Sequence, residues 1–325
     1  MKDVQIIDIS YTVGEIKLDS EDIAKKFKLD PEKLNKLTGI SILRLFDKSK
    51  GNIVDRLVHL IEETLTRNSL KKSDISGIFG SSNQIGATLM PTVTTTVAVK
   101  AGFKNIIPDH VGIGCAGGVQ AVRAAYNQIH QDLRDFGESS YYLVIGGEDT
   151  GVTVNQNDYK TASLFSDACY VLLLTNDESK SGRTIEYVRS MSLLGEEALT
   201  CMSIDNYLHS GNVESQRFVM DGKKVQLFAR KLWFYIQQLT RKKFTENELR
   251  EMYLIPHQAN LRIIEMIMKR YDLNPELVHA EGIKKYGNTS NASAFIGLAN
   301  SFHKKEKLLV APFGAELQVG MIVIS

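Results

Sequence analysis

Cysteine is scarce in this chain, with three residues in 325. Cys115, Cys169 and Cys201 are widely spaced and form no CxxC pair. Because zinc sites and disulfide frameworks need paired or regularly spaced cysteines, we expect neither. No ligand cluster and no glycine fingerprint occurs where a strand leads into a helix, so we also expect no metal and no nicotinamide cofactor.

Long apolar runs are absent as well. No stretch reaches the roughly 18 apolar residues of a membrane span, and the N-terminus lacks a basic segment followed by a long apolar run. The formal net charge is only +1, which provides no overall attraction to nucleic acid or to a membrane. We therefore expect a cytoplasmic protein without nucleic-acid or membrane partners.

Short apolar runs are present, and they alternate with longer segments that carry apolar residues at helical spacing. This alternation predicts an α/β fold. The expected strands are residues 4–10, 75–80, 109–113, 141–145, 168–174, 184–191, 252–256, 308–311 and 317–324. The expected helices are residues 52–67, 116–129, 222–239, 259–270 and 292–303.

The length of the chain exceeds what one ordinary hydrophobic core needs. A polar, turn-forming segment, residues 175–183, falls near the middle. We therefore expect two α/β halves, residues 1–176 and residues 177–325. No sequence repeat is visible between them, so any duplication has to be structural.

One cysteine has a distinctive context, in the segment VGIGCAGGV at residues 111–119. Cys115 follows an expected strand and precedes an expected helix, near backbone N–H groups and a helix dipole that both favour a thiolate. The glycines let the backbone bend and a substrate approach. This context fits a nucleophile that forms a thioester. The alternative is a small buried core residue, as free cysteines often are.

Two further polar residues follow the same pattern. His257 comes directly after an expected strand, where α/β folds place their chemistry, and Asn288 follows Gly287 at the start of another expected helix. Each residue also has an ordinary structural interpretation. A lone histidine is often a satisfied structural residue, and an asparagine before a helix is often an N-cap.

Together the three segments resemble β-ketoacyl-ACP synthase III, whose signature is a cysteine before a helix, then HQAN, then GNTS. Here HQAN is residues 257–260 and GNTS is residues 287–290. The order and spacing fit from residue 80 to the end, whereas the first 70 residues match only loosely. The resemblance implies a thiolase fold, in which two similar α/β halves form five layers, α-β-α-β-α.

The resemblance also implies an acyltransferase of fatty-acid or polyketide-type biosynthesis. Cys115 would accept an acyl group from a thioester, and a malonyl thioester would lose CO2 and attack it. A neutral His257 and the amide of Asn288 would stabilise the enolate oxygen. Backbone N–H groups of Cys115 and Ala315 would form a second oxyanion site, next to Gly314. Phe313 matches an aromatic residue beside the decarboxylation site, and its alternative role is core packing.

Binding partners are implied by the same resemblance. Arg262, with Lys269 and Arg270 further along, corresponds to the region that contacts the phosphopantetheine arm or an acidic acyl carrier protein, although such residues are usually solvated charge. Met90 corresponds to a residue inserted across a homodimer interface into the partner's acyl pocket. The substrates are carried on coenzyme A or on the carrier protein, and no further cofactor is implied.

The chain departs from the family at the positions that hold the adenine of coenzyme A, where our alignment places Lys33, Leu37 and Tyr159. A glycine-rich FGDGAG segment reads FSDACY at residues 165–170, and the C-terminal triple glycine reads GAE at residues 314–316. These differences favour a specialised enzyme that takes its acyl group from a carrier protein or an unusual thioester.

Two other functions remain open. The Cys115 acyl group could pass to a hydroxyl or amine, with His257 as general base. Asn288 argues for condensation instead, since acyl transfer to oxygen or nitrogen has no enolate to stabilise. A non-catalytic subunit is the third possibility, but no residue of the expected triad is missing.

Overall fold

The computed structural model describes residues 2–82, 91–112, 114–193, 199–200, 219–240, 243–314 and 317–325. Within these ranges its main feature is a ten-stranded mixed sheet. Its strands are β1 (Gln5–Val13), β4 (Ile75–Ser81), β5 (Ile107–Gly112), β6 (Tyr141–Glu148), β7 (Ala168–Thr175), β8 (Arg183–Ser192), β11 (Tyr253–Pro256), β12 (Leu308–Ala311), β13 (Phe313–Gly314) and β14 (Gln318–Ile324).

The sheet consists of two halves with the same strand order and the same directions. In the first half, β1, β7 and β6 are antiparallel neighbours, and β4 and β5 continue in parallel. In the second half, β8, β14 and β12 are antiparallel neighbours, and β11 continues in parallel. Next to β11, a single parallel bridge between Leu254 and Val278 takes the position that β5 has next to β4 in the first half. The duplication is therefore structural.

The two halves meet where β1 pairs with β8, through Gln5 with Thr184 and Ile6 with Arg183. The chain crosses from one half to the other between β7 and β8. The pairing of β1 with β8 joins the two halves into one continuous sheet. The predicted division of the chain into halves at residues 176 and 177 therefore remains a prediction.

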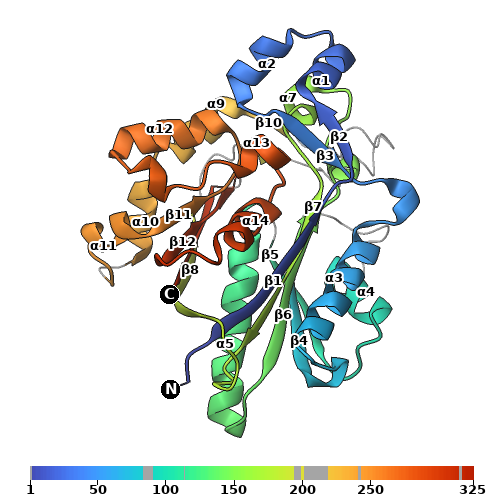
Figure 1. The fold of residues 1–325 in the computed structure, drawn as a ribbon, viewed down its shortest axis with the longest axis vertical. Helices are drawn as coiled ribbons and strands as arrows, with labels where there is room; N and C mark the ends of the chain where they lie inside the picture. Colours follow the sequence, from blue (N-terminus) through green and yellow to red (C-terminus); the bar gives the residue numbers. More distant parts are fainter. Residues whose placement is uncertain are drawn as a thin grey trace.

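Helices form three layers around the two half-sheets (Figure 1). α3 (Ile53–Arg67) and α4 (Val93–Lys100) cover the outer face of the first half. α5 (Gly117–Phe136) and α14 (Ala292–Ser301) fill the space between the halves. The outer face of the second half is covered by α9 (Gly222–Ala229), α10 (Leu232–Thr240) and α12 (Leu261–Tyr271). This arrangement confirms the expected five-layered thiolase fold.

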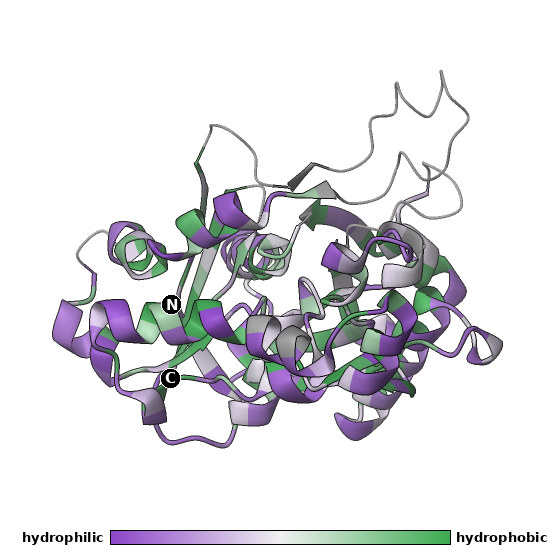
Figure 2. Cartoon of the chain, turned by 90° about the horizontal axis from the view of Figure 1, so that it is seen from above, coloured by the Kyte–Doolittle hydropathy of each residue, from purple (hydrophilic) through white to green (hydrophobic). Residues whose placement is uncertain are grey.

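The strand sequences explain the layers. Successive side chains of a strand point to opposite faces, and a strand buried on both faces reads as a continuous apolar run. In β7, Tyr170 and Leu172 pack in the central core, whereas Cys169 and Val171 pack in the outer core. β12 behaves in the same way between the central and the other outer core. Figure 2 shows apolar residues on the inner strands and helices and polar residues on the outer helices.

A small cap, which the sequence patterns did not predict, precedes α3. It consists of β2 (Ile16–Asp19), α1 (Ser20–Phe27), α2 (Pro31–Thr38) and β3 (Ile42–Leu45), and it lies above α9, α12 and α13 (Gly282–Tyr286) in Figure 1. Gly39 ends α2 with φ +70°, and a Cβ there would lie 2.3 Å from Cβ of Leu261 in α12. Only glycine permits both this conformation and this close approach.

The predicted helix at residues 222–239 is two helices. The N–H of Lys231 bonds to Phe228 O, three residues back, so the chain tightens and changes direction between α9 and α10. The other short elements are η1 (Lys48–Lys50), η2 (Lys72–Asp74), α6 (Thr150–Thr153), α7 (Tyr159–Ala162), β9 (Leu199–Thr200), β10 (Val219–Met220), α11 (Glu246–Glu251) and η4 (Pro275–Leu277). Among the described helices, none has the length and apolar character needed to span a membrane.

Candidate active site

Cys115 lies directly before the central helix α5, as its sequence context predicts. Gly114 has φ +76°, which turns the chain at the end of β5 and presents the cysteine at the N-terminus of a 20-residue helix. The N-cap residue Ala116 makes no side-chain cap, so no side chain competes for the first N–H groups of the helix. The residue is 9% exposed. Aligned peptide dipoles and N–H groups at this position favour a thiolate.

Asn288 is held in place by its own backbone. Its N–H donates to Leu164 O at 3.0 Å, and its carbonyl accepts from the N–H of Ser166 at 2.8 Å. Gly287 must be glycine, because φ is +69° and a Cβ there would lie 2.5 Å from Oγ of Ser166. The N-cap of α14 is Asn291 rather than Asn288, so the N-cap interpretation of Asn288 is wrong.

The side chain of Asn288 has a defined orientation. Its Oδ1 accepts the N–H of Ser290 at 2.9 Å, in an Asx turn. Because the oxygen is occupied in this way, the amide NH2 is the end that remains to face a ligand.

His257 follows β11 and is 2% exposed. Burial lowers its pKa from 6.5 to about 3, so the imidazole is neutral at physiological pH. Nδ1 lies 2.5 Å from Oγ of Ser293, and the ring of Phe313 stands edge-on to the imidazole with centroids 5.3 Å apart. Phe313 itself is buried in the outer core of the second half. Phe313 can therefore pack in the core and also stand beside the proposed decarboxylation site.

The start of α14 connects the three predicted residues. Ser290 Oγ lies 3.7 Å from Sγ of Cys115, and Ser290 N–H bonds to Asn288. Three residues later, Ser293 bonds to His257. Neither serine was predicted as a site residue, although both belong to the segment GNTSNAS that contains Asn288.

Gln258 was also missed, and it fixes the loop after β11. Its Nε2 donates to Pro256 O and His279 O, and its Oε1 accepts the N–H of Ile283. One buried amide therefore ties the end of β11 to the segment that leads into α13. The glutamine of HQAN thereby holds the adjacent His257 in place.

The other predicted site residues are more scattered. Gly314 pairs with Gln318 in the β13–β14 turn next to Phe313, whereas Ala315 and Met90 lie outside the described residues. Arg262 is exposed, and its Nε donates to Lys36 O of the cap while its guanidinium pairs with Glu265. In this structure, Arg262 therefore fastens the cap to α12.

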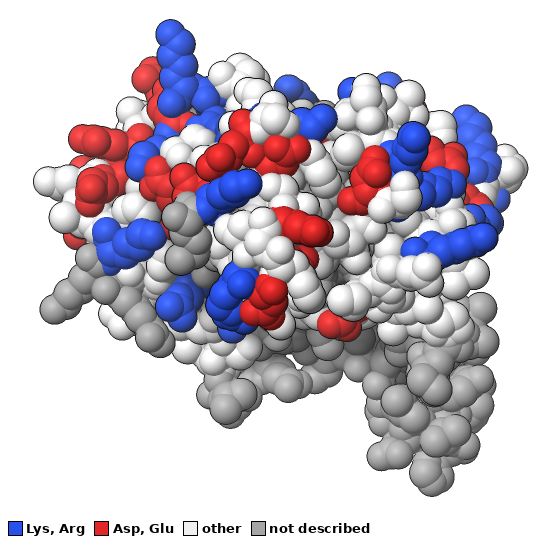
Figure 3. All heavy atoms as spheres, turned by 90° about the horizontal axis from the view of Figure 1, so that it is seen from below, with Lys and Arg blue, Asp and Glu red and all other residues white. Residues whose placement is uncertain are grey.

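Lys269 and Arg270 are exposed in the last turn of α12. Charges of both signs are mixed over the face of the molecule shown in Figure 3. Within the described part of the chain, no group of three or more His, Cys, Asp and Glu residues is arranged to hold a metal ion.

Tyr170, one of the departures at positions that are glycine in the related family, fills space next to the first turn of α5. Tyr170 stacks on Phe295 of α14, with ring centroids 4.4 Å apart. Its hydroxyl lies against Gly118 of α5 and Gly146 of β6, where an added Cβ would approach it to 2.4 and 2.6 Å. Tyr170 thus occupies room that Gly118 leaves open, one turn after Cys115.

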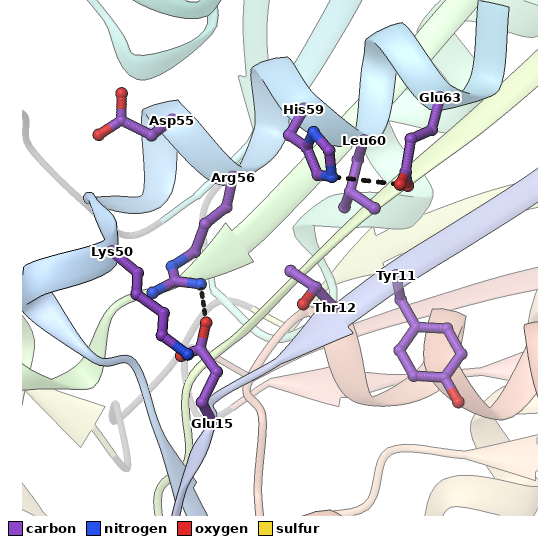
Figure 4. A pocket seen from close by; sticks show the side chains of 9 residues that line it. All are labelled: Tyr11, Thr12, Glu15, Lys50, Asp55, Arg56, His59, Leu60 and Glu63. Carbon is purple, nitrogen blue, oxygen red and sulfur yellow. Dashed lines mark hydrogen bonds and ion pairs between the residues drawn. The ribbon is translucent and has the colours of Figure 1, made fainter. Parts of the chain in front are cut away.

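A separate cleft of about 380 Å³ lies between β1 and α3 (Figure 4). Arg56 pairs there with Glu15, His59 lies 3.1 Å from Glu63, and Asp55 pairs with Lys100. None of the predicted site residues lines this cleft. The chemistry predicted from the sequence therefore belongs to the region around α5 and α14.

The buried neutral His257 should make stability depend on pH. As the pH falls below 6.5, the unfolded chain protonates this histidine, whereas the folded chain does so only near pH 3. Its contribution is therefore complete above pH 6.5 and declines between pH 6.5 and 3. The free energy of unfolding, measured with denaturant, should fall more steeply on acidification for wild type than for His257→Asn. The slopes of this free energy against pH should differ by up to about 1.4 kcal/mol per pH unit.

His279 is the internal reference for this experiment. Burial lowers its pKa to about 4, and it is present in both proteins, so its effect cancels in the comparison. Equal slopes for the two proteins would show that His257 is not desolvated.

Comparisons with known proteins agree on one family. The family model described as 3-oxoacyl-[acyl-carrier-protein (ACP)] synthase III matches residues 111–191, and the model of its C-terminal part matches residues 239–325. Together these matches span just over half of the chain. β-Ketoacyl-[acyl-carrier-protein] synthase III of Clostridium perfringens strain SM101 is 25% identical over 338 aligned positions, covering 100% of this chain and 99% of the relative.

Solved structures show the same fold. 3-Oxoacyl-[acyl-carrier-protein] synthase III from Aquifex aeolicus VF5 superposes with a TM-score of 0.83 at 22% identity, covering 99% of both chains. The priming β-ketosynthase of the R1128 polyketide biosynthetic pathway superposes with a TM-score of 0.82 at 21% identity, covering 99% of this chain and 96% of the other.

Proposed function

The chain belongs to the β-ketoacyl-ACP synthase III family, and on that basis we propose that it condenses a Cys115-bound acyl group with a malonyl thioester, with loss of CO2. The observation that carries the proposal is the convergence of a helix-terminal cysteine, a neutral buried histidine and an oriented amide at the start of α14. The named relatives act on acyl carrier protein substrates, which fits this chemistry.

In the first half-reaction, the Cys115 thiolate attacks the carbonyl of an acyl thioester. A C–S bond forms to Cys115, and the C–S bond to the donor breaks, releasing the donor as a thiolate. The negative charge on the carbonyl oxygen requires N–H donors, and the backbone at the N-terminus of α5 is the proposed source. The second predicted donor, Ala315, lies outside the described residues. The neutral imidazole of His257 keeps its one ring N–H throughout this step, because a neutral imidazole is a very weak acid.

In the second half-reaction, the C–C bond to the malonyl carboxylate breaks and CO2 leaves. The bonding electron pair becomes an enolate, whose charge lies largely on the thioester oxygen. Two neutral donors, the imidazole of His257 and the NH2 of Asn288, stabilise that oxygen without repelling the departing carboxylate. The enolate carbon then attacks the acyl-cysteine, and Cys115 leaves as the thiolate it was at the start.

The pKa of His257 argues against the alternative acyl transfer to a hydroxyl or amine. An effective general base has a pKa near the working pH, whereas burial lowers that of His257 to about 3. A histidine that resists protonation is a poor base but a suitable hydrogen-bond donor. Condensation therefore uses both His257 and Asn288, and acyl transfer uses neither well.

A carrier protein is the proposed acyl donor. The positions that hold adenine in related enzymes are Lys33, Leu37 and Tyr159 in our alignment, and an aromatic–arginine clamp is missing from them. The exposed Lys269 and Arg270 on α12 are available to an acidic partner. We propose that the carrier's pantetheine arm enters beside the cap, next to α12.

Homodimerisation is also proposed, through β5. This strand ends the sheet order, so among the described strands none pairs with its outer edge. Ile107 on this strand is 51% exposed, which is unusual for a large apolar side chain in a sheet. Met90 lies outside the described residues, and its insertion into a partner's pocket remains a prediction.

The test is a product assay by mass spectrometry. The protein is incubated with a series of acyl-CoA and acyl-carrier thioesters, with and without malonyl carrier protein. The expected result is a β-ketoacyl carrier product two carbons longer than the donor acyl group, with release of CO2 and with carrier thioesters preferred. Discharge of the acyl group only to an alcohol or amine would show that acyl transfer is the correct function.

A further inference from the structure

The two ring nitrogens of His257 have different surroundings. In the neutral form, only one of them carries hydrogen. Nδ1 faces α14 and lies 2.5 Å from Oγ of Ser293, which also accepts the N–H of Gln258 at 3.2 Å. Nε2 is on the opposite side of the ring, away from this serine.

The hydrogen bonds of Ser293 decide which nitrogen is protonated. Ser293 is buried, with 3% of the residue exposed, so solvent does not take up its hydroxyl hydrogen. Within the described ranges, Nδ1 of His257 is the one acceptor with hydrogen-bond geometry to this hydroxyl. A hydroxyl that must donate to Nδ1 requires a lone pair there. The ring hydrogen is then on Nε2.

We propose that Ser293 is a positioning residue, whose hydroxyl holds His257 in the Nε2–H tautomer and so makes it a hydrogen-bond donor to the enolate. This inference rests on the proposed condensation and deepens it. Ser293 acts through His257 and needs no contact with the substrate.

The tautomer matters for one half-reaction only. During decarboxylation, the electron pair of the breaking C–C bond moves toward the thioester oxygen, and Nε2–H donates to that oxygen without losing its proton. The Nδ1–H tautomer would present a lone pair to the same oxygen and would repel its charge. Acylation of Cys115 relies on backbone donors, so it does not depend on the tautomer.

The direct test is a two-bond ¹H–¹⁵N spectrum of protein with labelled histidine, in which the two neutral tautomers give distinct patterns. Comparison with His257→Gln identifies the His257 signals among the seven histidines. We expect the Nε2–H pattern in wild type and a mixture of tautomers in Ser293→Ala. The Nδ1–H pattern in wild type would overturn the proposal, whether or not any variant folds.

The kinetic test separates the two half-reactions. Ser293→Ala should lower condensation by about 10- to 100-fold, with KM for the malonyl substrate little changed and with normal acylation of Cys115. The acid limb of the pH–rate profile for condensation should also move to higher pH in Ser293→Ala. The hydrogen bond from Ser293 stabilises neutral His257, so its removal raises the pKa of the ring. Ser293→Thr keeps the hydroxyl and should restore the wild-type tautomer.

Ser301→Ala is the matched control. Ser301 is a buried serine of the same helix, 2% exposed and more than two turns away from Ser293. It should leave both half-reactions and the tautomer unchanged. If Ser293→Ala condenses at the wild-type rate with an unchanged spectrum, Ser293 has no positioning role. If wild type condenses no thioester at all, the proposed function fails, while the spectrum still tests the tautomer.

Discussion

Cys115→Ala is expected to eliminate the covalent acyl adduct seen by intact-protein mass spectrometry, together with all product formation. The reason is that the thioester bond forms at the sulfur itself, so no neighbouring group can replace it. The substitution removes one buried sulfur atom from the start of α5 and leaves the helix sequence intact. The variant should therefore remain folded, as circular dichroism and thermal unfolding can verify.

Cys169→Ala is the matched control. Cys169 is fully buried in the outer core of the first half, and burial raises the pKa of its thiol, which keeps it protonated and unreactive. This variant should acylate at the wild-type rate. An adduct that survives in Cys115→Ala, or one that disappears in Cys169→Ala, would show that Cys115 is not the nucleophile.

Asn288→Asp is expected to lower condensation by about 10²- to 10³-fold, while acylation of Cys115 stays near the wild-type rate. Aspartate keeps the size of the side chain and can still accept the N–H of Ser290. The change replaces a neutral NH2 donor with a carboxylate oxygen, which repels both the malonyl carboxylate and the enolate. Single-turnover kinetics measure the two half-reactions separately, with acyl-enzyme prepared first and malonyl carrier protein added afterwards.

Asn274→Asp provides the control for this charge change. Asn274 also accepts the backbone N–H two residues ahead, that of Glu276 at 3.1 Å, but it does so in an exposed turn. We expect no effect on either half-reaction. Condensation by Asn288→Asp within a few-fold of wild type would mean that the amide does not stabilise an enolate.

The fold was predictable wherever a segment is buried on both faces. The runs that form β7 and β12 are continuous in apolar residues because each strand lies between two cores, and their expected limits agree with the structure to within a residue. The cap was not predicted, because its helices are short, with eight residues each in α1 and α2, and α1 buries only Ile23 and Ala24. Their position depends on distant contacts such as that of Gly39 with Leu261.

The three residues proposed for the site each have a local signal in the sequence, a polar residue between a strand and a helix, and the structure places them where that signal predicts. Ser290 and Ser293 have no such signal. Serines at a helix start are ordinary, and nothing near them in sequence indicates that one lies beside Cys115, 175 residues away, and the other beside His257, 36 residues away.

The sequence patterns by themselves predicted the α/β class, because residue type and periodicity along a single segment are imposed directly by local sterics and burial. The five layers, and the proposed nucleophile Cys115 with its partners His257 and Asn288, came from the resemblance of three motifs to the β-ketoacyl-ACP synthase III family. The tertiary structure decided the charge state of His257, the orientation of the Asn288 amide and the path of the cap. Each of these depends on desolvation or on hydrogen bonds to residues far away in the chain, which exist only after the two halves have packed on α5 and α14.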